Sequence, residues 1–111
     1  MKLDRDEATI WATCFQALGD PSRILILHLL ATTGRPMTVG EITAALDIGQ
    51  STVSHHLRKL AEVRFVLVAQ DRNSSFYRVN DECLTCLPTA AQLVMGQVPA
   101  ERFASAGGRQ Q

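Results

Sequence analysis

The stretch QSTVSHHLRKL, residues 50 to 60, decides the fold. Val53, Leu57 and Leu60 recur at the spacing of one helical face, so this face can pack on a hydrophobic core. The other face carries short polar side chains at its start and two cations further along. Short hydrogen-bonding side chains can reach base edges in the major groove of DNA, whereas Arg and Lys neutralise phosphates. The pattern predicts a recognition helix, and its alternative is an ordinary solvated amphipathic helix.

The residues just upstream favour the recognition helix. TVGE, residues 38–41, has the form of a capping box, in which a hydroxyl and a carboxylate satisfy the first amides of a helix. Val39, Ile42 and Leu46 give this short helix one apolar stripe, and residues 47–49 (DIG) interrupt it. Two short amphipathic helices joined by a turn that contains Gly form a helix-turn-helix, whose second helix contacts DNA. The DNA contacts predicted for that helix are Gln50, Ser51, Thr52, Ser54, His55, Arg58 and Lys59.

The first third of the chain predicts two more helices. Apolar side chains recur at helical spacing over residues 8–18, and Gly19 ends that helix. Asp20 as N-cap and Pro21 at the first helical position start the next one. Residues 24–30 are apolar nearly all round, as expected for the buried central helix of a small bundle.

The residues after the recognition helix predict a β-hairpin. Residues 65–70 and 75–79 are rich in β-branched and aromatic side chains, and residues 71–74 between them form the turn. Asn73 is the turn residue expected to adopt a left-handed conformation. The hairpin is a wing beside the recognition helix, and Arg72 and Arg78 are its predicted DNA contacts.

The C-terminal part predicts one further helix and a tail. The helix covers roughly residues 89–97, with Pro88 at its start. Beyond Pro99 the chain is rich in Ala, Gly, Ser and Gln and has no apolar period. We therefore expect one domain over residues 1–98 and a disordered tail over residues 99–111.

Composition and charge limit the function classes. The chain has 111 residues and a formal net charge of zero, which by itself argues against a strongly basic nucleic-acid binder. Residues 50–80, however, hold five Arg or Lys and two Asp or Glu, a local charge of +3. Local potential steers phosphate encounter more than total charge does. The sequence has no apolar run long enough for a membrane span and an acidic start unlike a signal peptide, so we expect a cytoplasmic protein.

The chain resembles the ArsR/SmtB family of winged helix-turn-helix transcriptional repressors. The resemblance covers residues 8–97 and is carried by LGDPSRI (18–24), QSTVSHHL (50–57) and YRV (77–79). It implies a mainly α fold with a two-stranded β-wing (α+β). It also implies a homodimer formed by the first and last helices, which binds a palindromic double-stranded DNA operator and leaves it when an inducer binds.

Two positions depart from the family pattern. Arg64 stands where such proteins usually place Gly after the recognition helix, and the wing tip also lacks its usual Gly. Gly is preferred after a helix because it adopts the left-handed conformation without strain. The sequence therefore predicts a costlier or differently shaped wing with added positive charge.

The family's inducer sites are at most partly present. Val39-Gly40-Glu41 replaces the Cys-x-Cys of the arsenic-type site. The zinc-type site is matched only at Asp81 and Cys83, because Val94 and Gln97 stand where its other ligands are expected. No cofactor is required, and the candidate inducer ions are arsenite, nickel and zinc.

The three cysteines are the remaining candidate ligands. Cys14, Cys83 and Cys86 offer three thiolates, which suit a thiophilic ion such as arsenite. Two alternatives are buried packing residues and a thiol-oxidation sensor. An odd number of cysteines in a reducing compartment argues against structural disulfides.

The three histidines are further candidate functional residues. His55 and His56 are expected to face DNA or to pack, and His28 to be a core or interface residue or a nickel ligand. A winged-helix protein-interaction module without DNA binding is the alternative function. An enzyme is not expected, because the sequence has no Ser/His/Asp set, Gly-rich phosphate loop or complete metal site.

Overall fold

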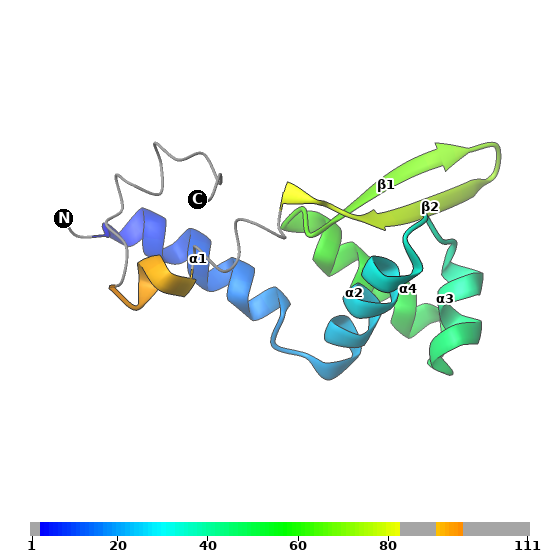
Figure 1. Cartoon of the computed structure of the whole chain (residues 1–111), viewed down its shortest axis with the longest axis horizontal. Coiled ribbons are helices and arrows are strands. Elements are labelled where there is room, and N and C mark those ends of the chain that lie inside the picture. Colours follow the sequence, from blue (N-terminus) through cyan, green and yellow to red (C-terminus); the bar gives the residue numbers. More distant parts are fainter. Residues whose placement is uncertain (1–2, 83–90, 97–111) are drawn as a thin grey trace. The chain divides into compact units, whose positions relative to one another are not determined.

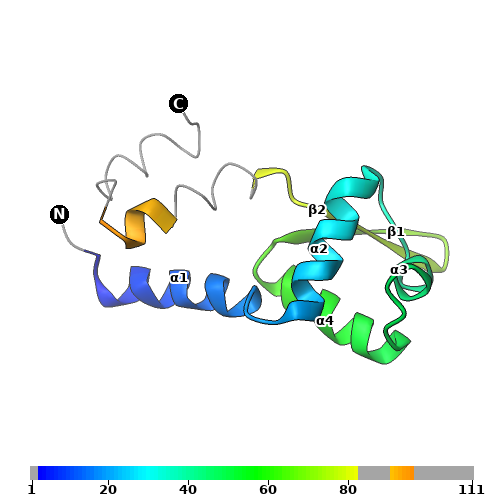
Figure 2. The same ribbon diagram turned by 60° about the horizontal axis from the view of Figure 1, so that its bottom comes forward.

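The computed structural model describes residues 3–82 and 91–96, which form two compact units. One unit comprises Met1–Ala12 and Asp81–Gln111, and the other comprises Thr13–Asn80. Figure 1 shows the helices and the hairpin coloured along the chain, and Figure 2 shows the same ribbon turned by 60°. The elements are α1 (Arg5–Ala17), α2 (Pro21–Thr33), α3 (Val39–Leu46), α4 (Gln50–Glu62), β1 (Val66–Asp71) and β2 (Ser74–Val79).

Helix α1 begins three residues earlier than its apolar pattern predicts. The reason is a reciprocal cap: the Glu7 amide donates to Asp4 Oδ1 at 2.8 Å, and the Asp4 amide donates to Glu7 Oε1 at 3.1 Å. At the other end of the chain, residues 91–94 are helical, within the predicted final helix. Pro88, the rest of that helix and the predicted tail over residues 99–111 lie outside the described residues.

Helix α2 starts as predicted but is buried on one face only. Asp20 Oδ1 accepts hydrogen bonds from the amides of Ser22 and Arg23, at 2.8 and 3.4 Å. Ile26 and Leu30 are buried. The expectation of a helix buried all round is wrong, since other apolar side chains of α2 are about half exposed: Ile24 (47%) and Leu25 (51%). Helix α2 packs through one face on α3, α4 and β2, which leaves its opposite face uncovered within this unit.

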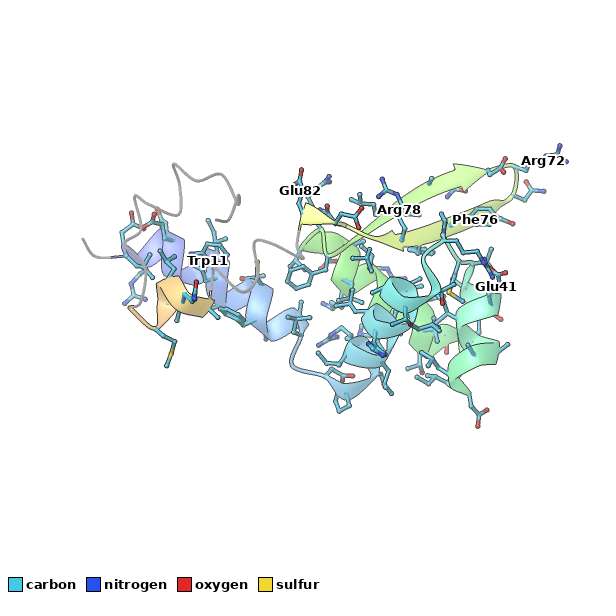
Figure 3. The ribbon with its side chains drawn as sticks, in the orientation of Figure 1. Trp11, Glu41, Arg72, Phe76, Arg78 and Glu82 are labelled. Carbon is cyan, nitrogen blue, oxygen red and sulfur yellow. The ribbon has the colours of Figure 1, made fainter. Side chains whose placement is uncertain are left out.

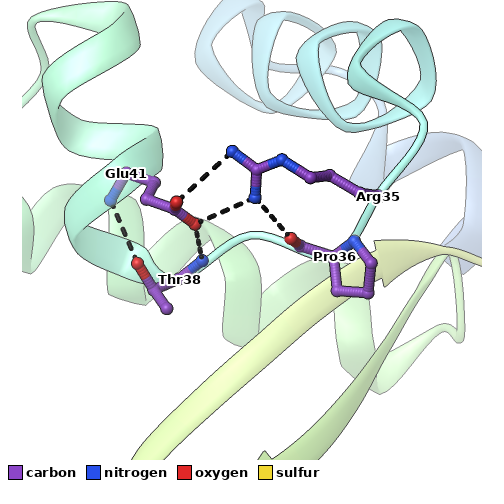
Figure 4. A network of polar contacts seen from close by, with 4 residues as sticks. All are labelled: Arg35, Pro36, Thr38 and Glu41. Carbon is purple, nitrogen blue, oxygen red and sulfur yellow. Dashed lines mark hydrogen bonds and ion pairs between the residues drawn. The ribbon is translucent and has the colours of Figure 1, made fainter.

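The helix-turn-helix is formed by α3 and α4, as the sequence predicts. Ile42 of α3 and three residues of α4 are fully buried: Val53, Leu57 and Leu60. The predicted capping box is present, because Thr38 Oγ1 accepts from the Glu41 amide at 3.2 Å and Glu41 Oε1 accepts from the Thr38 amide at 3.0 Å. Figure 4 shows that Arg35 also pairs with the Glu41 carboxylate, at 3.3 Å. These bonds fix the start of α3 against the loop that precedes it.

A left-handed residue joins α4 to the wing. Arg64 has φ +63°. Its amide donates to the carbonyl of Ala61, and the amide of Phe65 donates to the carbonyl of Leu60, both at 3.0 Å. This pair of bonds is a Schellman motif, and the buried Phe65 and Leu60 supply the hydrophobic contact that accompanies it. The motif therefore forms with Arg at the position where Gly is favoured.

The wing is an antiparallel hairpin that lies along α2, α3 and α4 (Figure 1). Its two-residue loop consists of Arg72 and Asn73. Arg72, with φ +62°, is the left-handed residue, so the prediction for Asn73 is wrong. The sequence interpretation also missed a short third pairing, in which Met37 and Tyr77 exchange main-chain hydrogen bonds of 2.8 and 2.9 Å. This pairing ties β2 to the loop before α3.

Candidate nucleic-acid interface

Helix α4 presents a polar face to solvent and an apolar face to the core. Because a helix turns by about 100° per residue, its buried residues Val53, Leu57 and Leu60 leave the opposite side for the predicted DNA contacts. Ser54 is half-buried. The other predicted contacts of this helix are exposed: Gln50, Ser51, Thr52, His55, Arg58 and Lys59. A helix that packs on the core through one face and exposes polar side chains in its first turns can enter a major groove.

The first turn of α4 adds main-chain donors to this face. Gly49 is the N-cap, and no side chain accepts a hydrogen bond from the amides that follow it. Such amides are favourable partners for a phosphate oxygen. The start of α4 therefore exposes both side-chain and main-chain hydrogen-bonding groups.

The two cations of α4 lie in different surroundings. Arg58 is exposed and lies opposite the buried stripe. Lys59, one residue on, borders a hollow of about 230 Å³ at the junction of α1, α2 and α4. Among the described residues, neither cation has a hydrogen-bond or ion-pair partner. Both charges are therefore available to a phosphate, Arg58 from the centre of the face and Lys59 from its flank.

The wing supplies two more cations. Arg72 and Arg78 are exposed, and Figure 3 shows Arg72 at the loop end of the hairpin and Arg78 nearer its base. Asp71 lies beside Arg72 in the chain and reduces the net charge of the tip. The hairpin thus carries positive charge at both of its ends.

The histidines occupy three different environments. His55 is exposed on the polar face of α4, whereas His56 is buried and contacts Arg23 and Asp20 of the α2 start. His28 is exposed, so its placement in the core of a single chain is wrong. The sequence signal for the His56 contacts was weak, because Arg23 and His56 are 33 positions apart.

The described residues contain one of the three predicted cysteine ligands. Cys14 is a half-buried free thiol, and burial raises its pKa above the ordinary value of 9.0. Cys83 and Cys86 lie outside the described residues. Within residues 3–82 and 91–96, no three His, Cys, Asp or Glu side chains are grouped so that they could hold a metal ion.

Comparisons with known proteins agree with this geometry. Residues 20–67 match the family described as "Bacterial regulatory protein, arsR family". The chain is 39% identical over 71 residues to an uncharacterised HTH-type transcriptional regulator of Methanocaldococcus jannaschii, a match that covers 64% of this chain and 79% of that protein. It is 32% identical to the arsenical resistance operon repressor of Staphylococcus xylosus, over 66% of this chain and 68% of the repressor.

A solved structure supports the same assignment. The homodimeric winged helix-turn-helix DNA-binding domain from Mycobacterium bovis superposes with a TM-score of 0.66 and 25% identity, covering 91% of this chain and 94% of that one. In the part of the chain that the structure describes, no helix is both long enough and apolar enough to span a membrane. The helix-turn-helix, the wing and these matches together show that the chain belongs to the ArsR/SmtB family of winged helix-turn-helix, DNA-binding transcriptional repressors.

Proposed function

We propose that this repressor binds a palindromic operator as a homodimer in the cytoplasm, with the start of α4 in the major groove and the wing on the adjacent backbone. The observation that carries this proposal is the division of α4 into a fully buried stripe and an exposed polar face. Gln50, Ser51, Thr52 and Ser54 select the bases, because they lie in the part of the helix that can reach base edges. Cations of α4 and the wing neutralise phosphates, and these are Arg58, Lys59, Arg72 and Arg78.

Selection of operators from a random DNA library tests this assignment. Alanine at Gln50, Ser51, Thr52 or Ser54 should change the preferred sequence, because each removes a group that discriminates between base pairs. Thr33→Ala is a matched control, since Thr33 is an exposed threonine at the end of α2. Unchanged sequence preference in all four variants would remove the start of α4 from the base contacts.

Dimerisation is supported by apolar surface in the unit that contains both chain ends. Ile10, Val94 and Met95 are exposed there, and Met95 retains 75% of its accessible surface. The Mycobacterium bovis relative is a homodimeric domain. We place the interface on α1, the adjoining turn and the final helix, through Trp11, Phe15, Leu18, Leu93 and Val94. Sedimentation at micromolar concentration should give a dimer, and an operator footprint should contain two half-sites about 34 Å apart. A monomer with a single half-site would contradict both statements.

The proposed inducer is a thiophilic ion held by Cys14, Cys83 and Cys86. The Staphylococcus xylosus relative is an arsenical resistance operon repressor, and three thiolates suit a thiophilic ion such as arsenite. Because burial raises the pKa of Cys14, the ion must displace a proton from that thiol, and binding should weaken as pH falls. The test is a titration of the operator complex with arsenite, nickel or zinc, in which release of the protein from DNA is measured. The titration is repeated with the single Cys→Ser variants at the three positions. Release at the wild-type concentration in all three variants would show that the cysteines are packing residues.

A further inference from the structure

One titratable side chain of α4 faces inward. His56 is 8% exposed. Its ring Nδ1 lies 3.3 Å from a terminal guanidinium nitrogen of Arg23, and its Nε2 lies 3.8 Å from Asp20 Oδ1. Arg23 Nε also donates to the main-chain carbonyl of Ala17, at 2.6 Å. These contacts join the end of α1, the start of α2 and the middle of α4.

The chemistry of Arg23 determines where the His56 ring carries its proton. A guanidinium group only donates hydrogen bonds, so Nδ1 of His56 must be the acceptor. The proton of the neutral ring is therefore on Nε2, which faces the Asp20 carboxylate. Burial acts to raise the pKa of Asp20, but the amides of Ser22 and Arg23 and the charges of His56 and Arg23 lower it. The carboxylate thus stays ionised beside the ring while it caps α2.

We propose that Arg23 is a positioning residue for the recognition helix: by donating to Nδ1 it holds His56 in the Nε2–H tautomer and fixes α4 against the junction of α1 and α2. This inference rests on the proposed binding of operator DNA by α4. His56 and the polar face belong to the same helix. A change in how His56 packs against Arg23 and Asp20 therefore rotates the polar face relative to the second recognition helix of a dimer. A small misplacement then weakens contacts at both half-sites.

A second proton on His56 breaks this arrangement. It converts Nδ1 from an acceptor into a donor that faces another donor, and it places two positive charges 3.3 Å apart. The compensating attraction to Asp20 acts over the longer distance of 3.8 Å and does not restore the lost hydrogen bond. We therefore expect a doubly protonated His56 to weaken operator binding.

The other ionisable groups around the helix do not replace these contacts. On α4 itself, the His55 ring lies 5.6 Å from the His56 ring, measured between centroids, and is exposed to solvent. Helix α3 and strand β1 also pack on α4. Their carboxylates are exposed and make no hydrogen bond or ion pair with the His56 ring: Glu41, Asp47 and Asp71.

The first test needs no DNA. Long-range ¹H–¹⁵N NMR of the full-length protein near neutral pH distinguishes the two neutral tautomers of each histidine. We expect His56 as the Nε2–H tautomer, and we expect Arg23→Met, which removes the donor at similar length, to abolish that preference. A predominant Nδ1–H form in the wild type, or an unchanged tautomer in Arg23→Met, would overturn the proposal whether or not α4 binds DNA.

The second test compares the pH dependence of operator affinity in wild type and His56→Asn. The Asn side-chain oxygen can accept from Arg23 at the place of Nδ1 but cannot take up a proton. His28 and His55 are present in both proteins, so any contribution that they make to the pH dependence is common to both. When the pH is lowered from about 8 to about 5, wild type should lose about fivefold more operator affinity than the variant, which corresponds to one hydrogen bond.

Two controls separate positioning from loss of fold. Thermal unfolding should show that His56→Asn is folded at both pH values. If His56→Asn does not fold, Arg23→Met replaces it. Arg23→Met should bind the operator less tightly than wild type at neutral pH, and it should lose less affinity than wild type when the pH is lowered. Equal pH dependence in wild type and the folded variant would refute the positioning role. Absence of operator binding by the wild type would instead refute the proposed function, and the tautomer measurement would still decide the Arg23 contact.

Discussion

Replacing Arg58 by Ala should lower the salt dependence of operator binding. Arg58 is exposed on the face of α4 opposite the buried stripe, and within the described residues no carboxylate pairs with it. Its guanidinium can therefore take a phosphate without first breaking an ion pair. The substitution removes one charge from each recognition helix and leaves the buried face intact.

The magnitude follows from counterion release. Each neutralised phosphate contributes about 0.9 to the slope of log affinity against log salt. A dimer presents two copies of Arg58, so the slope should decrease by about 1.8 for Arg58→Ala. Lys59→Ala should change it in the same direction but by less, because Lys59 lies on the flank that borders the hollow near Arg23.

Fluorescence anisotropy over about 50 to 200 mM salt measures these slopes, on a specific operator and on an unrelated duplex. The variant should bind both duplexes less tightly than wild type does, because phosphates are common to all sequences. Arg35→Ala is the control: it removes the same charge, but the Arg35 guanidinium is already paired with Glu41. An unchanged slope in Arg58→Ala, or an equal decrease in the Arg35 control, would refute the placement of α4 on DNA.

Three further predictions concern stability. Leu57→Ala should lower the free energy of unfolding by about 2–5 kcal/mol, because it leaves a cavity between α4 and the core. Urea denaturation measures this change, and the control Val68→Ala should leave the free energy of unfolding almost unchanged because Val68 is half exposed. Arg64→Gly should raise that free energy by about 0.5–1 kcal/mol in the same assay by relieving the left-handed strain. The Thr38 amide and the Arg35 side chain lower the pKa of Glu41 below its ordinary value of 4.5. Glu41 therefore stabilises the protein above that value, and the stability difference from Glu41→Gln should vanish in acid.

Local features were predictable from the sequence. The capping box of α3 and the Asp20 cap of α2 depend on residues two or three positions apart, so the motif itself determines the contacts. The buried stripe of α4 follows from helical spacing alone, and all three of its predicted members are fully buried. The exposed polar side of this helix, which forms the candidate interface, follows from the same spacing.

Features that depend on packing were not predictable. The burial of α2 was overestimated because composition shows how apolar a helix is, but not which of its faces has a neighbour. The contact between Arg23 and His56, and the pairing of Met37 with Tyr77, join positions far apart in the chain. The left-handed turn residue was assigned to Asn73 on intrinsic preference, whereas the loop places Arg72 there. Hairpin geometry outweighs the preference of a single side chain in this turn.

The two left-handed arginines are best explained together. Arg64 and Arg72 occupy backbone positions with φ of +63° and +62°, where an L side chain costs about 0.5–1 kcal/mol relative to Gly. Gly would remove that cost at both positions but would also remove two of the five cations in residues 50–80, reducing their local charge from +3 to +1. The whole chain has zero net charge, so the residues outside 50–80 together carry a charge of −3, and attraction to phosphate depends on this positive segment. The two arginines at the ends of β1 thus combine a strained backbone conformation with positive charge beside the recognition helix, and the added charge is a reason for Arg instead of Gly at both positions.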